Sequence, residues 1–487
     1  MSGIRILAAA NGRCLAGAFA GCILAVAAAT LLSQQTPLQN SVQQPATGAQ
    51  VHTGVSSGLD ADARLQNLLA DHQFLRIESQ LDQMPPDQAQ FYRGILANRN
   101  NDLKTSIQLL EPLLVQFDQV EPSANPAKEK LVRKALAEDY LRSGDLVKAA
   151  KAYRALASRL RSNLSPDDLD EIELPLKLLP LAAANPPMTI DPYDPFQIQV
   201  AKNPLGLTDL PVYVDARPHS FMLDPTAPFN LIARSLAKEA GLNVSADSAT
   251  IRTLTGRTMQ VHVTVIPRFT IGGRITFRNM TAFVFEDADY AFPKSHYQVE
   301  GVLGYPALSA LGSLTITADD TIEVRPFKSN DKNAKDDLPL PGARFFLDGD
   351  QMIVALGNPQ GPGVGSIAPG SMRADERMYV VDASSQQTYL TSRYYEEHAA
   401  DFTGEKMQLF ALPGHEASPP QPAFVAETIP LAIGPTPVDV HYIQVLTQPL
   451  GNAALDDVYG VLGLDVLDQF RAYTFDYRTM RFSVKPE

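Results

Sequence analysis

The sequence has no tryptophan and only two cysteines among its 487 residues. Cys14 and Cys22 both lie in an amino-terminal apolar stretch, so the rest of the chain has no thiol, disulfide or cysteine metal ligand. The eight histidines are scattered, and none forms the His-Glu-x-x-His spacing of a zinc site. We therefore expect no metal and no cofactor, and a fold that is stabilised by packing.

The chain also lacks an excess of positive charge. It has 41 Lys and Arg against 54 Asp and Glu, which gives a formal net charge of −13. Because phosphate binding needs clustered Lys and Arg, this balance argues against a nucleic-acid partner. With 45% hydrophobic residues and this length, the chain is expected to form two to four globular domains.

The first 32 residues have the pattern of a targeting segment. Arg5 and Arg13 precede an uncharged run of 19 residues at 14–32, close to the ~20 that span a bilayer as a helix. Small residues at 25–27 also suit signal peptidase. The segment is therefore a cleaved signal peptide or, if uncleaved, an inner-membrane anchor. Either alternative predicts export to the bacterial periplasm or cell envelope.

A polar stretch at 33–57, rich in Gln, Ser, Thr, Pro and Gly, is typical of a flexible linker. Residues 58–183 then show apolar side chains at three- and four-residue spacing, which predicts helices. We expect this region to carry a docking surface for a protein partner.

Residues 131–160 resemble a tetratricopeptide repeat, with small Ala137 and Ala149 where two helices would pack closely and a turn at Gly144. A looser copy lies 43 residues earlier, with Gly94 at the position that corresponds to Ala137. A helical bundle without true repeats is the alternative interpretation.

The pattern changes after a proline-rich passage at 184–196, since proline ends helices. Alternating apolar residues follow, and Gly272-Gly273 between two such runs predicts a hairpin turn. A polar break at 328–342 divides this strand-rich region, so we expect two β domains at 198–327 and 340–487.

The two β regions repeat each other. Each places an aspartate directly after an apolar strand, Asp224 in FMLDPT and Asp382 in YVVDAS. A leucine and an arginine at the start of a short helix follow each aspartate, one residue further on in the second copy. The distance from Asp224 to Gly301 is 77 residues and from Asp382 to Gly460 is 78, and both glycines begin the motif GVLG. Such self-similarity indicates a duplication.

From Leu210 to the end, the sequence resembles the bilobal retropepsin-like aspartic proteases. The resemblance rests on the aspartate after an apolar strand, the middle strands at 255–285, and the apolar-apolar-Gly segments that end at Gly304 and Gly463. It implies an α+β multidomain chain in which an α-helical, tetratricopeptide-like hairpin domain precedes two all-β acid-protease lobes. It also implies that Asp224 and Asp382 are the catalytic pair, ~3 Å apart and sharing one proton.

The sequence departs from the family pattern directly after each aspartate. The family has Thr, whose hydroxyl bonds across the lobes, and then Gly, which lets amides approach the carboxylate. Here Pro225 and Thr226 follow the first aspartate, and Ala383 and Ser384 follow the second. We expect no cross-lobe hydroxyl network, and loops that bend differently or are strained.

Two functions follow from this pattern. The first is an exported aspartic endopeptidase that hydrolyses a peptide held between the lobes, with a water activated by Asp224 and Asp382. The second is an inactive pseudoprotease that binds a peptide or acts as a scaffold in the cell envelope. Whether the chain is an enzyme is left open at this point.

Overall fold

The computed structural model describes residues 56–120, 125–252, 258–327, 341–349, 351–357, 376–412, 419–451 and 453–486. The predicted targeting segment at 1–32 lies outside the described residues, as do the linker up to Val55 and most of the polar break at 328–342. No helix in the described part of the chain is both long enough and apolar enough to cross a bilayer.

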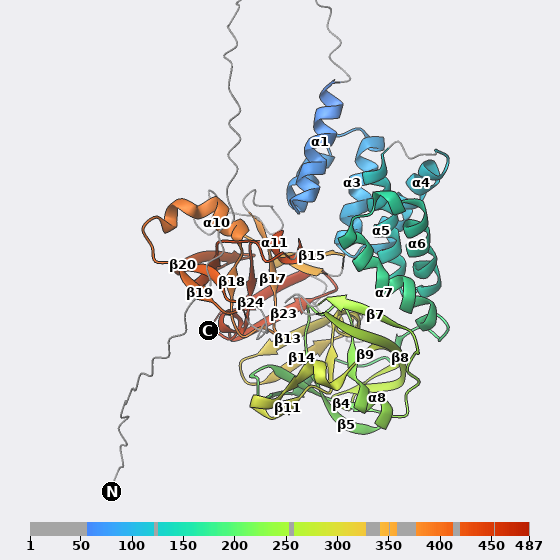
Figure 1. Cartoon of the computed structure of the whole chain (residues 1–487), viewed down its shortest axis with the longest axis vertical. Helices are drawn as coiled ribbons and strands as arrows, with labels where there is room; N and C mark the ends of the chain where they lie inside the picture. The colour runs from blue at the N-terminus through green and yellow to red at the C-terminus, as the bar shows by residue number, and fades with distance from the viewer. Residues whose placement is uncertain are drawn as a thin grey trace, which may run out of the picture. The chain divides into compact units, whose positions relative to one another are not determined.

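The chain is α+β, with its long helices in the amino-terminal part and its strands in the carboxy-terminal part (Figure 1). The helical region consists of α1 Ser56–Ala70, α2 Phe74–Leu81, α3 Pro86–Arg99, α4 Leu103–Asp118, α5 Pro126–Arg142, α6 Leu146–Arg159 and α7 Pro166–Ala182. Helix α1 begins at Ser56, two residues before the end of the predicted linker.

Two of the helical turns are encoded by the same device. Asn101 has a φ of 57° and Gly144 a φ of 79°, so each supplies the left-handed residue that ends a helix. The next residue then caps the following helix, since Asp102 accepts a bond from the amide of Thr105 and Asp145 caps α6 in the same way. These are the turns that the sequence predicts between α3 and α4 and between α5 and α6.

We call residues 189–325 the first β half and residues 343–485 the second β half. The first contains β1 Thr189–Ile190, β2 Phe196–Gln199, β3 Ala201–Lys202, β4 Thr208–Val214, β5 Arg217–Leu223, β6 Leu231–Ala233, α8 Arg234–Glu239, β7 Ser248–Arg252, β8 Thr258–Ile271, β9 Ile275–Phe285, β10 Ala291–Phe292, β11 Tyr297–Gln298, β12 Gly301–Leu303, α9 Tyr305–Ala310, β13 Ser313–Thr317 and β14 Thr321–Arg325.

The second half contains β15 Ala343–Asp348, β16 Gln351–Leu356, β17 Arg377–Val381, β18 Tyr389–Leu390, α10 Ser392–His398, β19 Gln408–Phe410, β20 Gln421–Ile433, β21 Thr436–Leu446, α11 Ala453–Asp456, β22 Gly460–Leu462, α12 Leu464–Leu467, β23 Ala472–Asp476 and β24 Arg481–Lys485.

The two halves have equivalent strand pairings. In the first, β12 lies between β5, which is parallel to it, and β6, which is antiparallel. In the second, β22 lies between β17 and β18 in the same two directions. Each half also has a long hairpin, β8–β9 and β20–β21. The turn of the first is at Gly272-Gly273, where both residues have positive φ, as the sequence predicts.

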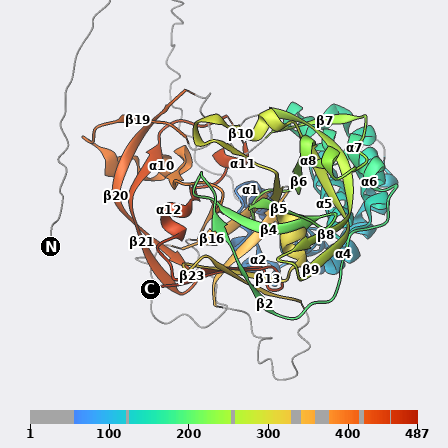
Figure 2. The same cartoon turned by 90° about the horizontal axis from the view of Figure 1, so that it is seen from below.

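One antiparallel sheet joins the halves through β13 and β23 (Figure 2). Thr315 pairs with Thr474 at its centre, and their hydroxyl oxygens lie 2.9 Å apart. Outward from this pair the order is symmetric, with β14 and then β2 on one side and β24 and then β15 on the other. The equivalent strands of the two halves therefore lie on opposite sides of the β13–β23 pair.

The strand register corrects one detail of the repeat. Leu231 lies in β6 rather than in a helix, and Val302 pairs with it, whereas Val461 pairs with Tyr389. Tyr389, and not Leu390, is therefore the equivalent of Leu231, and α8 and α10 both begin ten residues after their aspartates. The additional residue predicted before the second helix is absent at that place.

Candidate active site

Asp224 begins the loop that follows β5. Its amide donates to the carbonyl of Leu303 in β12, at 3.1 Å. Its Oδ1 accepts from the amide and the hydroxyl of Thr226, at 3.0 and 2.7 Å, and from the amide of Ala227 at 3.0 Å. The neighbouring strand thus fixes the backbone, and the loop fixes the carboxylate.

Asp382 has the same surroundings after β17. Its amide donates to the carbonyl of Leu462, at 2.9 Å. Its Oδ1 accepts from the amide and the hydroxyl of Ser384, at 2.8 and 2.6 Å. Both aspartates are of intermediate burial.

Two glycines let the backbone cross closely behind these loops. A Cβ on Gly304 would lie 2.2 Å from the carbonyl oxygen of Phe229, and a Cβ on Gly463 would lie 2.7 Å from that of Gln387. The amide of Gly304 donates to Asn230 Oδ1 at 3.2 Å, and that of Gly463 donates to Thr388 Oγ1 at 2.8 Å. Only glycine fits at these positions.

The electrostatics link the two loops. Burial and the negative charge of Asp224 raise the pKa of Asp382 to about 6, although the hydrogen bonds from Ser384 and Ser385 work in the opposite direction. The charge of Asp224 therefore acts on the carboxyl group of Asp382 in the equivalent loop.

The loops differ from the expectation of strain. Thr226 and Ser384 stand where glycine was expected, yet neither has a positive φ. Each side chain instead turns back and donates its hydroxyl to its own aspartate. The hydroxyl and the amide of one residue thus both bind the carboxylate, without left-handed backbone. These two roles were missed, although a hydroxyl residue two positions after each aspartate was the signal for them.

Aromatic side chains also lie near the pair. Burial and the charge of Asp382 raise the pKa of Tyr389, and burial together with Tyr305 and Asp224 raises that of Tyr477. Both phenols therefore stay neutral over the physiological range. Neither was singled out in the sequence, because a lone tyrosine after a strand carries no motif.

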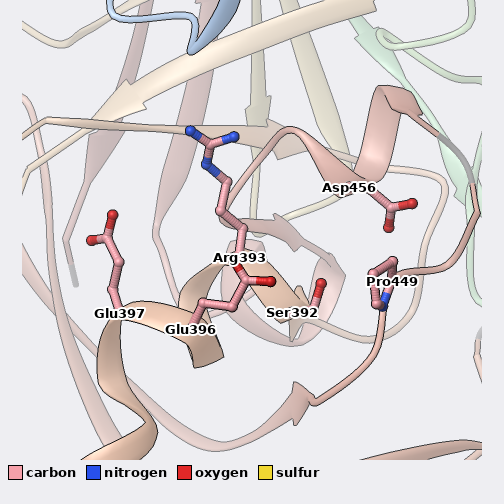
Figure 3. Close-up of a pocket in the computed structure, with 6 residues that line it drawn as sticks. All are labelled: Ser392, Arg393, Glu396, Glu397, Pro449 and Asp456. Atoms are coloured by element: carbon pink, nitrogen blue, oxygen red, sulfur yellow. The ribbon is translucent and has the colours of Figure 1, made fainter. Parts of the chain in front are cut away.

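No group of three or more His, Cys, Asp or Glu side chains within the described ranges has the arrangement of a metal site. A hollow of about 300 Å³ does lie beside α10 and α11, lined by Ser392, Arg393, Glu396, Glu397, Pro449 and Asp456 (Figure 3). Its lining includes neither Asp224 nor Asp382.

This arrangement of a loop aspartate, a crossing strand and a glycine has a counterpart among known families. Residues 210–307 match the aspartyl protease family model. The aspartyl protease match covers the first β half from β4 to α9, and so includes Asp224 and Gly304. No curated protein sequence matches the chain.

Solved structures that match the chain include two 7S globulins and one protease. Conglutin gamma, a basic 7S globulin from lupine seeds, is 10% identical over 61% of this chain and 96% of its own, with a TM-score of 0.37. Basic 7S globulin from soybean is 12% identical over 60% and 95%, with a TM-score of 0.35. A retropepsin-like aspartic protease from Rickettsia conorii is 17% identical over 28% and 94%, with a TM-score of 0.21.

Proposed function

We propose that this chain is an aspartic-type endopeptidase whose catalytic pair is Asp224 and Asp382. The observation that carries the proposal is the equivalent placement of the two aspartates, each in a loop after a strand that is parallel to β12 or β22 and each bound by a hydroxyl of its own loop. The charge of Asp224 and burial also raise the pKa of Asp382, to about 6. Two close carboxylates that cannot both ionise easily keep one proton between them, which is what peptide hydrolysis without metal or covalent intermediate needs. The aspartyl protease match over residues 210–307 supports the same chemistry.

The reaction uses the two carboxylates in different protonation states. The ionised carboxylate takes a proton from a water, whose oxygen bonds to the peptide carbonyl carbon, while the protonated one donates to the carbonyl oxygen. The carbon–nitrogen bond then breaks, and the nitrogen leaves as an amine after it receives a proton. The hydroxyls of Thr226 and Ser384 keep the carboxylates in place.

In this proposal the two β halves are two retropepsin-like lobes, at 198–327 and 340–487, and an extended peptide lies between them. Their equivalent pairings and the symmetric sheet around Thr315 and Thr474 support this interpretation. The helical region at 58–183 is proposed to be tetratricopeptide-like, which the paired turns at Asn101 and Gly144 support.

Cleavage of a peptide library by the purified chain between pH 3.5 and 8 tests the proposal. We expect pepstatin-sensitive turnover whose kcat/KM falls as the pH rises through about 6, because Asp382 must hold the shared proton. Asp224→Asn and Asp382→Asn should each lower kcat/KM by ~10³-fold or more. Turnover that is unchanged in both variants would contradict the proposal.

One observation favours a second function, that of a pseudoprotease which binds peptides. Pro225 has neither a hydroxyl nor an amide hydrogen, and Ala383 has no hydroxyl, so neither loop can donate a side-chain bond to the other half from this position. Loss of such a preorganised bond costs ~10² to 10³ in rate. If the library is bound but not cut, and Asp224→Asn binds it equally well, the second function holds.

We also propose that the protein is exported, and that residues 1–32 are its signal peptide or, uncleaved, its inner-membrane anchor. The basic start followed by 19 uncharged residues supports this. Amino-terminal sequencing of the protein recovered from cell fractions distinguishes the alternatives. A full-length chain in the cytoplasm would contradict both.

A further inference from the structure

The turn that follows β15 inserts an acidic residue into the helical region. Asp348 is the last residue of β15, and its Oδ1 lies 2.7 Å from Arg99 Nη2 of α3. Its Oδ2 lies 2.8 Å from Nδ1 of His72, which precedes α2. The Arg99 side chain is 5% exposed and that of Asp348 is 19% exposed, so this is a largely buried ion pair between the helices and the second half.

Residues of α3 and α5 position the Arg99 side chain for this contact. Its Nη1 donates to Asn98 Oδ1 at 2.6 Å and pairs with Glu138 of α5 at 3.3 Å. Asn98 in turn donates to Asp139 Oδ1 at 2.8 Å, and Ser106 donates to Asp139 Oδ2 at 2.6 Å. A buried polar network across α3, α4 and α5 therefore holds the Arg99 guanidinium in place for its contact with Asp348.

The residue after Asp348 also fits closely. Gly349 has a φ of 60°, and a Cβ there would lie 2.9 Å from Glu171 Oε1 and 3.5 Å from Lys134 Nζ. Lys134 and Glu171 are themselves paired at 2.6 Å. The backbone of the turn thus lies directly against a second ion pair. A side chain at 349 would move the Glu171 carboxylate and, at a φ of 60°, would strain the turn.

Both partners of the contact stay charged over a wide pH range. Burial alone would lower the pKa of His72, but Asp348 and Asp457 raise it to about 9. Burial would raise the pKa of Asp348, but Arg99, His72 and Lys134 lower it. Both groups of the contact are therefore charged near pH 6, the pKa of Asp382.

The equivalent turn of the first half has a different partner. The turn at 203–207 lies between β3 and β4, as Gly349 lies between β15 and β16. There the carbonyl of Leu205 accepts from Nε2 of Gln386, at 2.9 Å, and Gln386 follows Asp382 by four residues. One turn thus contacts the opposite aspartate loop, and the other is bound by the helices.

The anchored turn is connected to the second aspartate through the pairing of two strands. Strand β16 leaves the turn and pairs with β17, with Ile353 opposite Val380, and β17 ends one residue before Asp382. We propose that Arg99 and His72 are positioning residues, which fix the place of Asp382 relative to Asp224 by holding the Asp348–Gly349 turn. This inference rests on the proposed catalytic pair, but it can be tested without turnover.

The test uses the full chain and two changes in the turn. Asp348→Asn removes the charge, and Gly349→Ala strains the turn while every charge stays. In each background, and in the unchanged chain, the carboxyl groups are titrated by nuclear magnetic resonance from pH 3.5 to 8, and the melting temperature is measured. The carboxyl signal that Asp382→Asn removes is that of Asp382, and its midpoint is the pKa of this group in the folded state.

We expect a midpoint near 6 in the unchanged chain. It should move by about one unit or more towards 3.8 in both turn variants, because Asp382 is then less close to Asp224. The control is Arg93→Met. Arg93 lies on α3, as Arg99 does, and the change removes its exposed pair with Asp82 and should leave the midpoint in place.

Three results can be told apart. A shifted midpoint in both turn variants supports positioning, even when no peptide is cut and the proposed function has failed. A lower melting temperature with an unmoved midpoint overturns the inference, because the anchor is then only structural. If Asp348→Asn does not fold, Gly349→Ala decides the question alone, and an unmoved midpoint in it overturns the inference as well.

Discussion

The two β halves hold their aspartates by the same bonds but are themselves held by different means. Helix α7 contributes Leu174, Leu178 and Ala182 to an apolar core that extends through both halves. The second half shares a further apolar core with α1 to α5 and is bound in addition by ion pairs, those of Arg99 with Asp348 and of Arg344 with Glu78. The bonds within an aspartate loop are therefore independent of how its half is anchored.

The comparison also shows which parts of the loops tolerate change. Proline in one loop and alanine in the other occupy the position after the aspartate, while a hydroxyl residue occupies the next position in both. The hydroxyl and the amide of Thr226 and of Ser384 bind the carboxylates identically. The duplicated feature is the hydrogen-bond pattern rather than the sequence.

The largest effect is expected where backbone crosses backbone. Gly304→Ala should destabilise the fold by about 3 kcal/mol or more, since its Cβ would lie 2.2 Å from one carbonyl oxygen and 2.5 Å from another. Gly463→Ala should cost less, because its nearest contact is 2.7 Å. Urea unfolding measures both.

Gly144→Ala is the control for these two glycines, because nothing lies within 4 Å of its Cβ and only its positive φ of 79° is lost. It should cost about 1 kcal/mol. Equal losses at Gly304 and Gly144 would show that the crossing is not tight.

A pH series should reveal the raised pKa of Asp382. The folded-state pKa of Asp382, about 6, lies above its ordinary 3.8, so ionisation of this group opposes folding as the pH rises through 6. Asp382→Asn should therefore stabilise the fold at pH 7 by roughly 2–3 kcal/mol relative to its effect at pH 3.5. Thermal unfolding from pH 3.5 to 8 measures this, and a difference that does not depend on pH would contradict the raised pKa.

A smaller effect is expected at the hydroxyls. Ser384→Ala removes a bond that favours the ionised carboxylate, so it should raise the pKa of Asp382 further and cost about 1–2 kcal/mol at pH 7. Thr226→Val makes the matching change in the first half. Nuclear magnetic resonance titration of the carboxyl groups reads the pKa directly, and a fall in it after Ser384→Ala would refute this role.

The smallest effect is expected at the contact between turn and loop. Gln386 is exposed, and Gln386→Leu removes its single bond to the carbonyl of Leu205, so a loss below about 1 kcal/mol is expected. Asp348→Asn at the equivalent turn should cost more, because it leaves the buried Arg99 with one partner fewer. Equal losses in chemical unfolding would remove the contrast between the two anchors.

Local patterns predicted much of the fold. The turns at Gly144 and at Gly272-Gly273 were predicted because a positive φ needs few residue types. The positions of Asp224 and Asp382 after apolar strands were predicted because a duplication preserves spacing. The register of the second copy was wrong by one residue, since Leu390 and its neighbour Tyr389 are both buried and apolar enough to replace one another in an alignment.

Contacts between distant charged residues could not be predicted in this way. Arg99 is the last residue of α3 and lies in a polar run at 98–102, where a cation normally faces water, and nothing near it in the chain points to Asp348. The sequence left open whether the aspartate loops bend differently or are strained, and positive φ, one form of strain, is not observed at Thr226 or Ser384. The expectation of strain treated Thr226 and Ser384 as obstacles to the amides, whereas their side chains supply a bond of their own.

The sheet that joins the halves has a consequence for how the protein is made. Strand β13 leaves the ribosome long before its partner β23. Its edge in the first half therefore stays unpaired while about 150 residues are synthesised. Non-local pairing of this kind is slow and exposes the nascent chain to misassembly. The sheet that joins the halves is therefore completed only by the last strands of the chain.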